Sequence, residues 1–343
     1  MLVRTSLAIA VCVIGCGRVV APPPSPPAPA PPAASAERAE PASAAPISSS
    51  VSTDALPSPD GATLAGPPGP TLDAKMPLGQ VVLVDSGAAP RRALRYAAPP
   101  PKPELIEMTL SLTMTVRQGM KAAPRMQVPP VVATLELAGN GTDENGDLKG
   151  IFTVRGLDMK LQGPPEKLSA IRQGLKRVVG MKGDFVRTSR GEIKNAKMRG
   201  DAQQDAMLKQ GFEQAIAFIA APFPREPVGV GARWVHTTKV EQREVTLTQQ
   251  TRFELVALKA EEATVAVSLI QQAPAQPIQT PDGQKVQLLS MMGRGNNKQV
   301  LRLDRLAPVG STSAVTTQMK LEVKTGGDQV LIKTDVRTDV AAK

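Results

Sequence analysis

The chain has 343 residues, with 41 lysines and arginines against 31 aspartates and glutamates, and it holds two cysteines, one tryptophan and one histidine. Its net charge of +10 raises nucleic acid as a partner, but basic patches interleaved with aromatic side chains are absent, so we expect none. The sequence also lacks a Gly-x-Ser-x-Gly elbow, an HExxH motif, a phosphate loop and a complete Gly-x-Gly-x-x-Gly. We therefore expect a non-catalytic protein without a metal or a cofactor.

A short basic start, made by the amino terminus and Arg4, precedes an apolar run at residues 7–14. This run is too short to span a bilayer and is typical of a signal-peptide core. Val13-Ile14-Gly15-Cys16, at the end of this run, resembles the lipobox of bacterial lipoproteins. The resemblance implies cleavage after Gly15 and acylation of Cys16. Residues 1–15 would then be a signal peptide, and the acylated Cys16 would attach the protein to a membrane.

Residues 16–75 are rich in Pro, Ala and Ser and contain very few branched or aromatic side chains. Such a composition cannot bury enough apolar surface to offset chain entropy, so we expect a disordered tether with polyproline II character. Gly17 follows the cysteine where lipoproteins retained in the inner membrane often carry aspartate. By that resemblance we expect an outer-membrane anchor, with the body in the periplasm or at the cell surface.

Alternating apolar and polar residues predict long antiparallel strands in the remaining residues, 76–343. The clearest run is 106–117, and a first strand is expected at 80–84 and 90–96. Further runs are at 131–138, 264–269, 315–324 and 330–337. Turn signals between the runs predict that successive strands pair as meanders.

Two helices are expected among the strands, at 165–179 and 201–221. A sheet with one buried face needs a cover, and the second helix is the better candidate. The predicted fold is mainly β: a long, strongly curved antiparallel sheet or half-barrel covered by one or two helices. A closed β-sandwich is the alternative.

Pro222–Trp234 contains the pattern Val-Gly-x-Gly-x-x-Trp, made by Val228, Gly229, Gly231 and Trp234. This turn after a helix, together with PRRALRY at 90–96, resembles a group of uncharacterised predicted bacterial lipoproteins. The resemblance would cover roughly residues 76–343, and it implies no activity and no catalytic residue.

The predicted function is the binding of an apolar or amphipathic ligand, such as a lipid, between the sheet and the second helix. Flexible, polarizable methionines on the buried side of the strands adapt to varied apolar ligands, although they fill irregular cores equally well. The alternative is a structural or interaction protein of the envelope with a filled core and no small-molecule ligand. The candidate ligand-binding residues are Leu208, Phe212, Ile216, Ile219, Met108 and Met114.

Cationic residues are concentrated between 172 and 199, where only Asp184 and Glu192 oppose them. Such a run is most often a solvated face, and its functional interpretation is a surface for anionic lipid or an anionic envelope polymer. The candidate contacts are Arg172, Lys176, Arg177, Lys182, Arg187 and Arg190.

Overall fold

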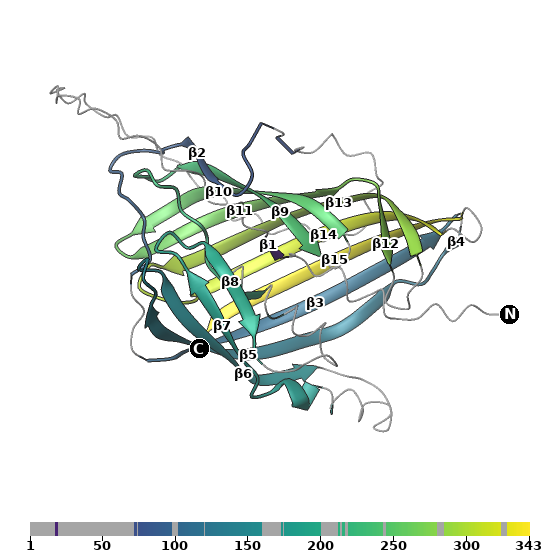
Figure 1. Cartoon of the computed structure of the whole chain (residues 1–343), viewed down its shortest axis with the longest axis horizontal. Helices are drawn as coiled ribbons and strands as arrows, with labels where there is room; N and C mark the ends of the chain where they lie inside the picture. Colours follow the sequence, from purple (N-terminus) through teal and green to yellow (C-terminus); the bar gives the residue numbers. More distant parts are fainter. Residues whose placement is uncertain are drawn as a thin grey trace, which may run out of the picture. The chain divides into compact units, whose positions relative to one another are not determined.

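The described part of the chain forms one antiparallel sheet, shown by the computed structural model in Figure 1. The structure describes Arg18, Val19 and residues 72–343, except for residues 74, 98–101, 120, 160–172, 174, 200–211, 213–214, 217–218, 243–244, 280–284 and 324–327. The predicted signal peptide and nearly all of the predicted tether therefore lie outside the described residues. The strands are β1 (Arg18–Val19), β2 (Val81–Asp85), β3 (Glu104–Gln118), β4 (Lys121–Ala122), β5 (Met126–Thr142), β6 (Leu148–Met159), β7 (Lys182–Arg187), β8 (Ile193–Met198), β9 (Arg233–Gln242), β10 (Val245–Lys259), β11 (Glu262–Ala273), β12 (Gln276–Gln279), β13 (Lys285–Arg302), β14 (Gly310–Val323) and β15 (Asp328–Ala342).

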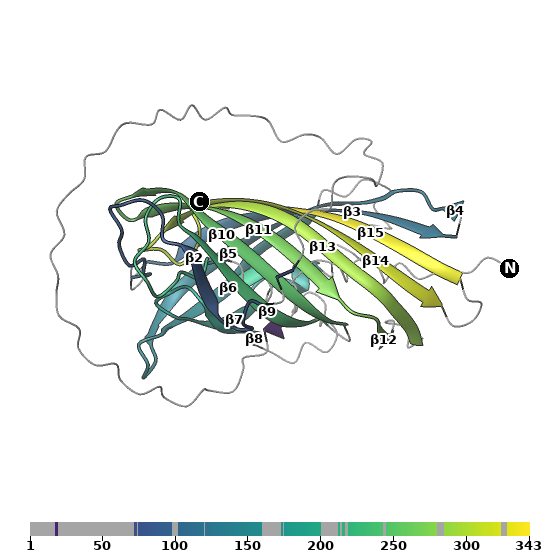
Figure 2. The same ribbon diagram turned by 90° about the horizontal axis from the view of Figure 1, so that it is seen from above.

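Two meanders make up this sheet. The order along it is β1-β9-β10-β11-β13-β14-β15-β3-β5-β6-β7-β8, and the strands that neighbour each other in this order are antiparallel. The C-terminal strand β15 joins the meanders by pairing with β3 along its length, from Val330 opposite Gln118 to Ala342 opposite Ile106. The sheet is strongly curved and is not closed into a barrel (Figures 1 and 2). A single sheet excludes the two-sheet sandwich.

The predicted alternation sets which face of each strand is buried. On β3, Ile106, Leu112 and Met114 are buried, whereas Arg117 at the end of the strand is exposed. The same alternation on β5, β14 and β15 places their apolar residues on one side of the sheet, because opposite residues in a register share a face. We call this side, which carries the buried side chains, the inner face.

The structure describes only parts of the two predicted helices, and it confirms only the first half of the predicted first strand. The predicted helix at 165–179 has helical backbone at 173 and 175–178. The predicted helix at 201–221 has it at residues 212, 215 and 216 but not at 219–221, and most of the other residues of both helices lie outside the described part. The expected strand at 80–84 is confirmed as β2, but 90–96 is not its continuation. Only Arg92 makes a bridge there, with Val228, because the segment pairs with residues 228–230 and not with β9: the Ala88 N–H donates to the Val230 carbonyl and the Arg92 N–H to the Val228 carbonyl.

The segments 86–97 and 219–232 cross one end of the sheet, which we call the covered end. Arg92 and Val228 exchange two backbone hydrogen bonds of 3.0 and 2.9 Å, so the two segments quoted for the family resemblance pair with each other. The Tyr96 backbone N–H donates to the Ser189 carbonyl at the β7–β8 turn. The covered end thus connects β9, at one side of the sheet, to β7 and β8 at the other. We call the opposite end, where β4 and β12 lie, the distal end (Figure 1).

Trp234 is the centre of the core at the covered end. Its side chain is 0 % exposed, stacks on Phe253 with ring centroids 5.5 Å apart and contacts Phe223 at 6.0 Å. Its Nε1–H donates a 2.7 Å hydrogen bond to the Pro222 carbonyl. Gly229 approaches the neighbouring segment so closely that a Cβ there would lie 1.7 Å from the Ala88 carbonyl oxygen. Both features give the Val-Gly-x-Gly-x-x-Trp pattern a structural role.

Candidate functional site

The predicted ligand-binding residues fall into two separate clusters on the inner face. Phe212, Ile216 and Ile219 are buried in the first cluster, and Met108 packs against it. Met114 belongs to another cluster, nearer the distal end. Leu208 lies outside the described residues. The structure therefore does not bring the whole predicted set into one site.

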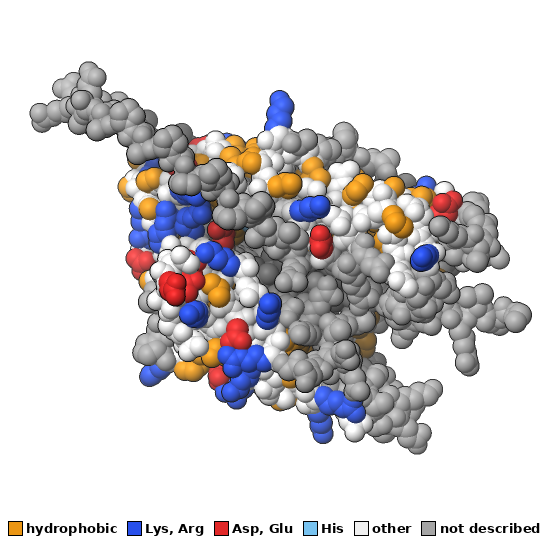
Figure 3. Space-filling model, in the orientation of Figure 1, with side chains coloured by type: hydrophobic (Ala, Val, Ile, Leu, Met, Phe, Trp, Pro, Cys, Tyr) orange, Lys and Arg blue, Asp and Glu red, His pale blue; other side chains and the backbone are white. Residues whose placement is uncertain are grey.

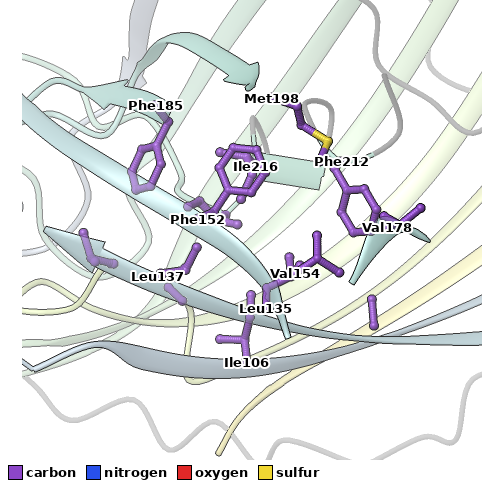
Figure 4. Packing of buried hydrophobic residues seen from close by; sticks show 14 of the residues in the cluster. Ile106, Leu135, Leu137, Phe152, Val154, Val178, Phe185, Met198, Phe212 and Ile216 are labelled. Atoms are coloured by element: carbon purple, nitrogen blue, oxygen red, sulfur yellow. The ribbon is translucent and has the colours of Figure 1, made fainter. Parts of the chain in front are cut away.

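The first cluster is a packed core beneath β5, β6 and β7. Figure 4 shows Phe212 between Met198 and Val178, and Ile216 against Phe152. Its aromatic rings lie over glycines of neighbouring strands: a Cβ on Gly150 would be 2.1 Å from the Phe185 ring. Such contacts are those of a closely packed core.

The second cluster, which we call the distal cluster, has a different construction. It contains Met114, Val240, Leu247, Ala273, Leu288, Met291, Leu321 and Ile332, with Met319 and other partly buried residues against it. Each of these named members lies on a strand of the same sheet, whereas the first cluster includes residues from helical backbone and from the β13–β14 connection. Among the residues that the structure describes, the distal cluster is thus built from one layer. Its buried members are at most 6 % exposed, and its methionines can adapt to whatever packs against them.

A row of polar residues runs across the inner face beside the distal cluster, and we call it the polar row. Consecutive registers align its members across six neighbouring strands, from β9 to β15. Its buried members are Thr238, Gln249, Gln271, Thr317 and Thr334, with Gly293 between Gln271 and Thr317. A buried apolar cluster and a band of hydrogen-bonding groups therefore lie next to each other.

Hydrogen bonds connect the glutamines of the polar row. Gln271 Nε2 donates to Gln249 Oε1 at 2.9 Å, and Gln249 Nε2 donates to Thr251 Oγ1 at 3.4 Å. Gly293 leaves space for this arrangement, because a Cβ there would lie 2.6 Å from Gln271 Oε1. The buried Thr334 Oγ1 makes no hydrogen bond with the described residues. A buried hydroxyl without a partner is costly, so the row retains hydrogen-bonding capacity for a polar group.

The polar row was not predicted, although a signal for it exists in the sequence. Thr317 and Thr334 stand at positions that the alternation assigns to the buried face, between apolar neighbours such as Met319 and Ile332. A polar residue at a buried position of a strand is informative, because it has to find a partner there. The alignment of such residues across strands depends on register, which no local pattern provides.

His236 is the single histidine of the chain. It lies on β9, where it pairs with Thr251 of β10 on one side and with Val81 of β2 on the other. Burial lowers its pKa to about 4, with the nearby Arg190 charge lowering it further. A neutral imidazole is therefore the form that the folded protein retains.

His236 predicts a pH dependence of stability. The unfolded chain binds a proton near pH 6.5 and the folded chain near 4, so the stabilisation is complete above pH 6.5 and is lost as the pH falls toward 4. The total loss should be about 3 kcal/mol. Urea unfolding between pH 7 and 4.5 should show the wild type losing more stability than His236→Gln. Equal slopes for the two proteins would contradict this prediction.

The predicted cationic surface is only partly a surface. Lys176, Arg177 and Lys182 are exposed, and Arg190 is partly buried 3.5 Å from Glu192. Arg172 lies outside the described residues. Figure 3 shows Lys and Arg side chains over β7 and β8 interspersed with Asp and Glu, consistent with the ion pairs Lys194–Asp147 and Arg199–Asp184.

The prediction of a surface contact is wrong for Arg187, because its side chain is only 1 % exposed. Its guanidinium lies 4.3 Å from the centroid of the Tyr96 ring and donates 3.1 Å hydrogen bonds to the carbonyls of Arg305 and Leu306. Burial lowers the pKa of Arg187 and raises that of Tyr96 to about 12. Arg187 therefore connects β7 to the β13–β14 connection and is inaccessible to an external anion.

No family profile and no curated protein matches this chain. Within the described residues, three or more His, Cys, Asp or Glu side chains nowhere gather as a metal would require. The same residues contain no helix of sufficient length and apolar character to cross a membrane. The candidate site is therefore defined by its geometry: the distal cluster and the polar row on the inner face.

Proposed function

We propose that this protein is a membrane-anchored envelope lipoprotein whose β body binds an apolar or amphipathic molecule, such as a lipid, without catalysis. The observation that carries the proposal is the one-layer distal cluster beside the polar row. Acyl chains would lie against methionines and branched side chains, where burial of each CH₂ contributes roughly 0.8 kcal/mol. The polar part of the molecule would meet the threonines and glutamines of the row.

The chemistry of the polar row restricts the ligand's polar group. Its members are hydroxyls and carboxamides, which both donate and accept hydrogen bonds and carry no charge. The nearest histidine on this face stays neutral at pH 7 because its pKa is lowered to about 4. The row therefore favours an uncharged hydrogen-bonding group, such as an ester or a hydroxyl, over a buried ionic one.

Attachment through acylated Cys16 is part of the same proposal and rests on the lipobox resemblance. The alternative, a structural or interaction protein with a filled core, is favoured by the first cluster, in which Phe212 and Ile216 are packed against neighbouring strands. The two proposals differ in whether the distal cluster binds a ligand, so the experiment measures ligand binding at that cluster.

Replacing Met319, a partly buried residue against the distal cluster, with glutamate should remove binding of an apolar probe. A carboxylate is too costly to bury beside an acyl chain. The measurement is fluorescence titration with N-phenyl-1-naphthylamine, an uncharged apolar dye, and with a fluorescent fatty-acid ester. Ala314→Glu is the matched control, because Ala314 is an exposed residue of the same strand.

Wild type and Ala314→Glu should bind the probes equally, and Met319→Glu should bind at least tenfold more weakly while its circular dichroism stays unchanged. Absence of probe binding by the folded wild-type protein would favour the filled-core alternative.

A further inference from the structure

We propose that the distal end of the sheet is a docking surface for an anionic lipid bilayer. The inference deepens the proposed function, on which it partly rests, by naming the source of the lipid and the orientation of the body. Two independent observations lead to it: the position of β1 and the charge around the distal end.

The strand β1 places the predicted anchor near the distal cluster. Val19 pairs with Val240, a 1 % exposed member of that cluster, and Arg18 pairs with Glu241. Cys16 precedes Arg18 by two residues, so an extended chain keeps it within about 7 Å of Arg18. Acyl chains on Cys16 would therefore enter a membrane close to the distal end, with the covered end pointing away from it.

The described residues of the distal end carry an excess of exposed positive charge. The cations come from different strands, and none of them forms an ion pair with another described residue. Among the acidic side chains that the structure describes at this end, only Glu241 and Glu322 oppose them. The exposed cations are Arg117 on β3, Arg125 before β5, Lys239 on β9, Lys285 on β13 and Lys320 on β14.

A cationic rim beside a buried apolar cluster is complementary to an anionic bilayer surface. Headgroup phosphates attract Lys and Arg within a Debye length, and the apolar interior lies directly behind the rim. The covered end differs in this respect, because several of its charges are neutralised in pairs such as Arg92–Glu261, Arg233–Asp85 and Arg302–Asp304. The distal end is therefore the end that fits a membrane surface.

The test uses residues 16–343 with Cys16→Ser, so that a lipid anchor cannot contribute. Cosedimentation with vesicles of phosphatidylethanolamine and phosphatidylglycerol (3:1) should show binding that falls at 0.5 M NaCl, and vesicles of phosphatidylcholine alone should bind poorly. Lys285→Gln/Lys320→Gln should weaken binding to the anionic vesicles by roughly 30-fold, since each basic residue at such a surface contributes about fivefold.

Lys259→Gln/Lys298→Gln is the matched control, because it removes the same charge from exposed positions of β10 and β13 away from the distal end. It should bind like the parent. Equal weakening of both double variants would show attraction by net charge alone and would overturn the proposed surface.

Orientation is tested separately with an environment-sensitive dye on a single introduced cysteine. Gln329→Cys places the dye at the start of β15, at the distal end, and Glu144→Cys places it in the β5–β6 turn, at the other end. Anionic vesicles should shift the emission of the first dye only. A shift of the second dye alone, or of neither dye, would contradict the proposal. If the protein binds the apolar probe in solution but does not bind vesicles, the docking surface is refuted and the proposed ligand site is not.

Discussion

Trp234→Ala should lower the free energy of unfolding by about 3–5 kcal/mol, because it empties the centre of the core at the covered end. The indole is 0 % exposed and stacks on Phe253, and its loss also leaves the buried Pro222 carbonyl without its 2.7 Å hydrogen bond. The effect should extend beyond β9, since the aromatic contacts run through Phe223 to Tyr96, which is tied to the β7–β8 turn. The measurement is urea unfolding followed by far-ultraviolet circular dichroism.

Trp234→Phe separates packing from the hydrogen bond. It retains a ring against Phe253 and loses the Nε1–H donor, so its cost should be smaller than that of the alanine variant. An alanine variant whose unfolding midpoint stays close to that of the wild type would show that the covered end does not depend on this residue.

Phe212→Ala should also cost about 3–5 kcal/mol, because Phe212 is 5 % exposed in the packed first cluster. Affinity for an apolar probe should stay unchanged, since the distal cluster contains none of the residues around Phe212. The two readouts are urea unfolding and probe titration on the same protein.

Phe212→Leu is the matched variant, because it keeps most of the buried volume and should recover much of the stability. A small loss of stability in Phe212→Ala accompanied by altered probe affinity would mean that this ring lines a ligand space. The proposed site would then move from the distal cluster to the first cluster.

The strands were predictable because their signal is local. Six apolar residues alternate with polar ones from 106 to 117, and a half-buried strand is the structure that matches period two. The Asn145-Gly146 turn between β5 and β6 was predictable for the same reason, with Gly146 at a positive φ of 78°.

The arrangement of the strands was not predictable from local pattern. Pairing of β15 with β3 joins residues more than 200 positions apart, and the buried Arg187 contacts Tyr96, Arg305 and Leu306, which are also distant from it in the sequence. A charged side chain in a cationic stretch of sequence is expected to be exposed to solvent. Arg187 instead contacts the Tyr96 ring and donates hydrogen bonds to two backbone carbonyls at the covered end. The expected set of ligand-binding residues fell into two clusters for a simpler reason: Met108 and Met114 lie on the same face of β3 but six residues apart, which is about 20 Å along a strand.

Native mass spectrometry of the protein purified from cells in a mild detergent, followed by solvent extraction and lipid analysis, tests the central proposal most directly. The chain with Cys16→Ser should carry a non-covalent lipid at near-stoichiometric occupancy, and Met319→Glu should carry none while Ala314→Glu carries the same lipid. A wild-type body that is folded and free of lipid, and that takes up none when lipid is added, would contradict a ligand-binding inner face.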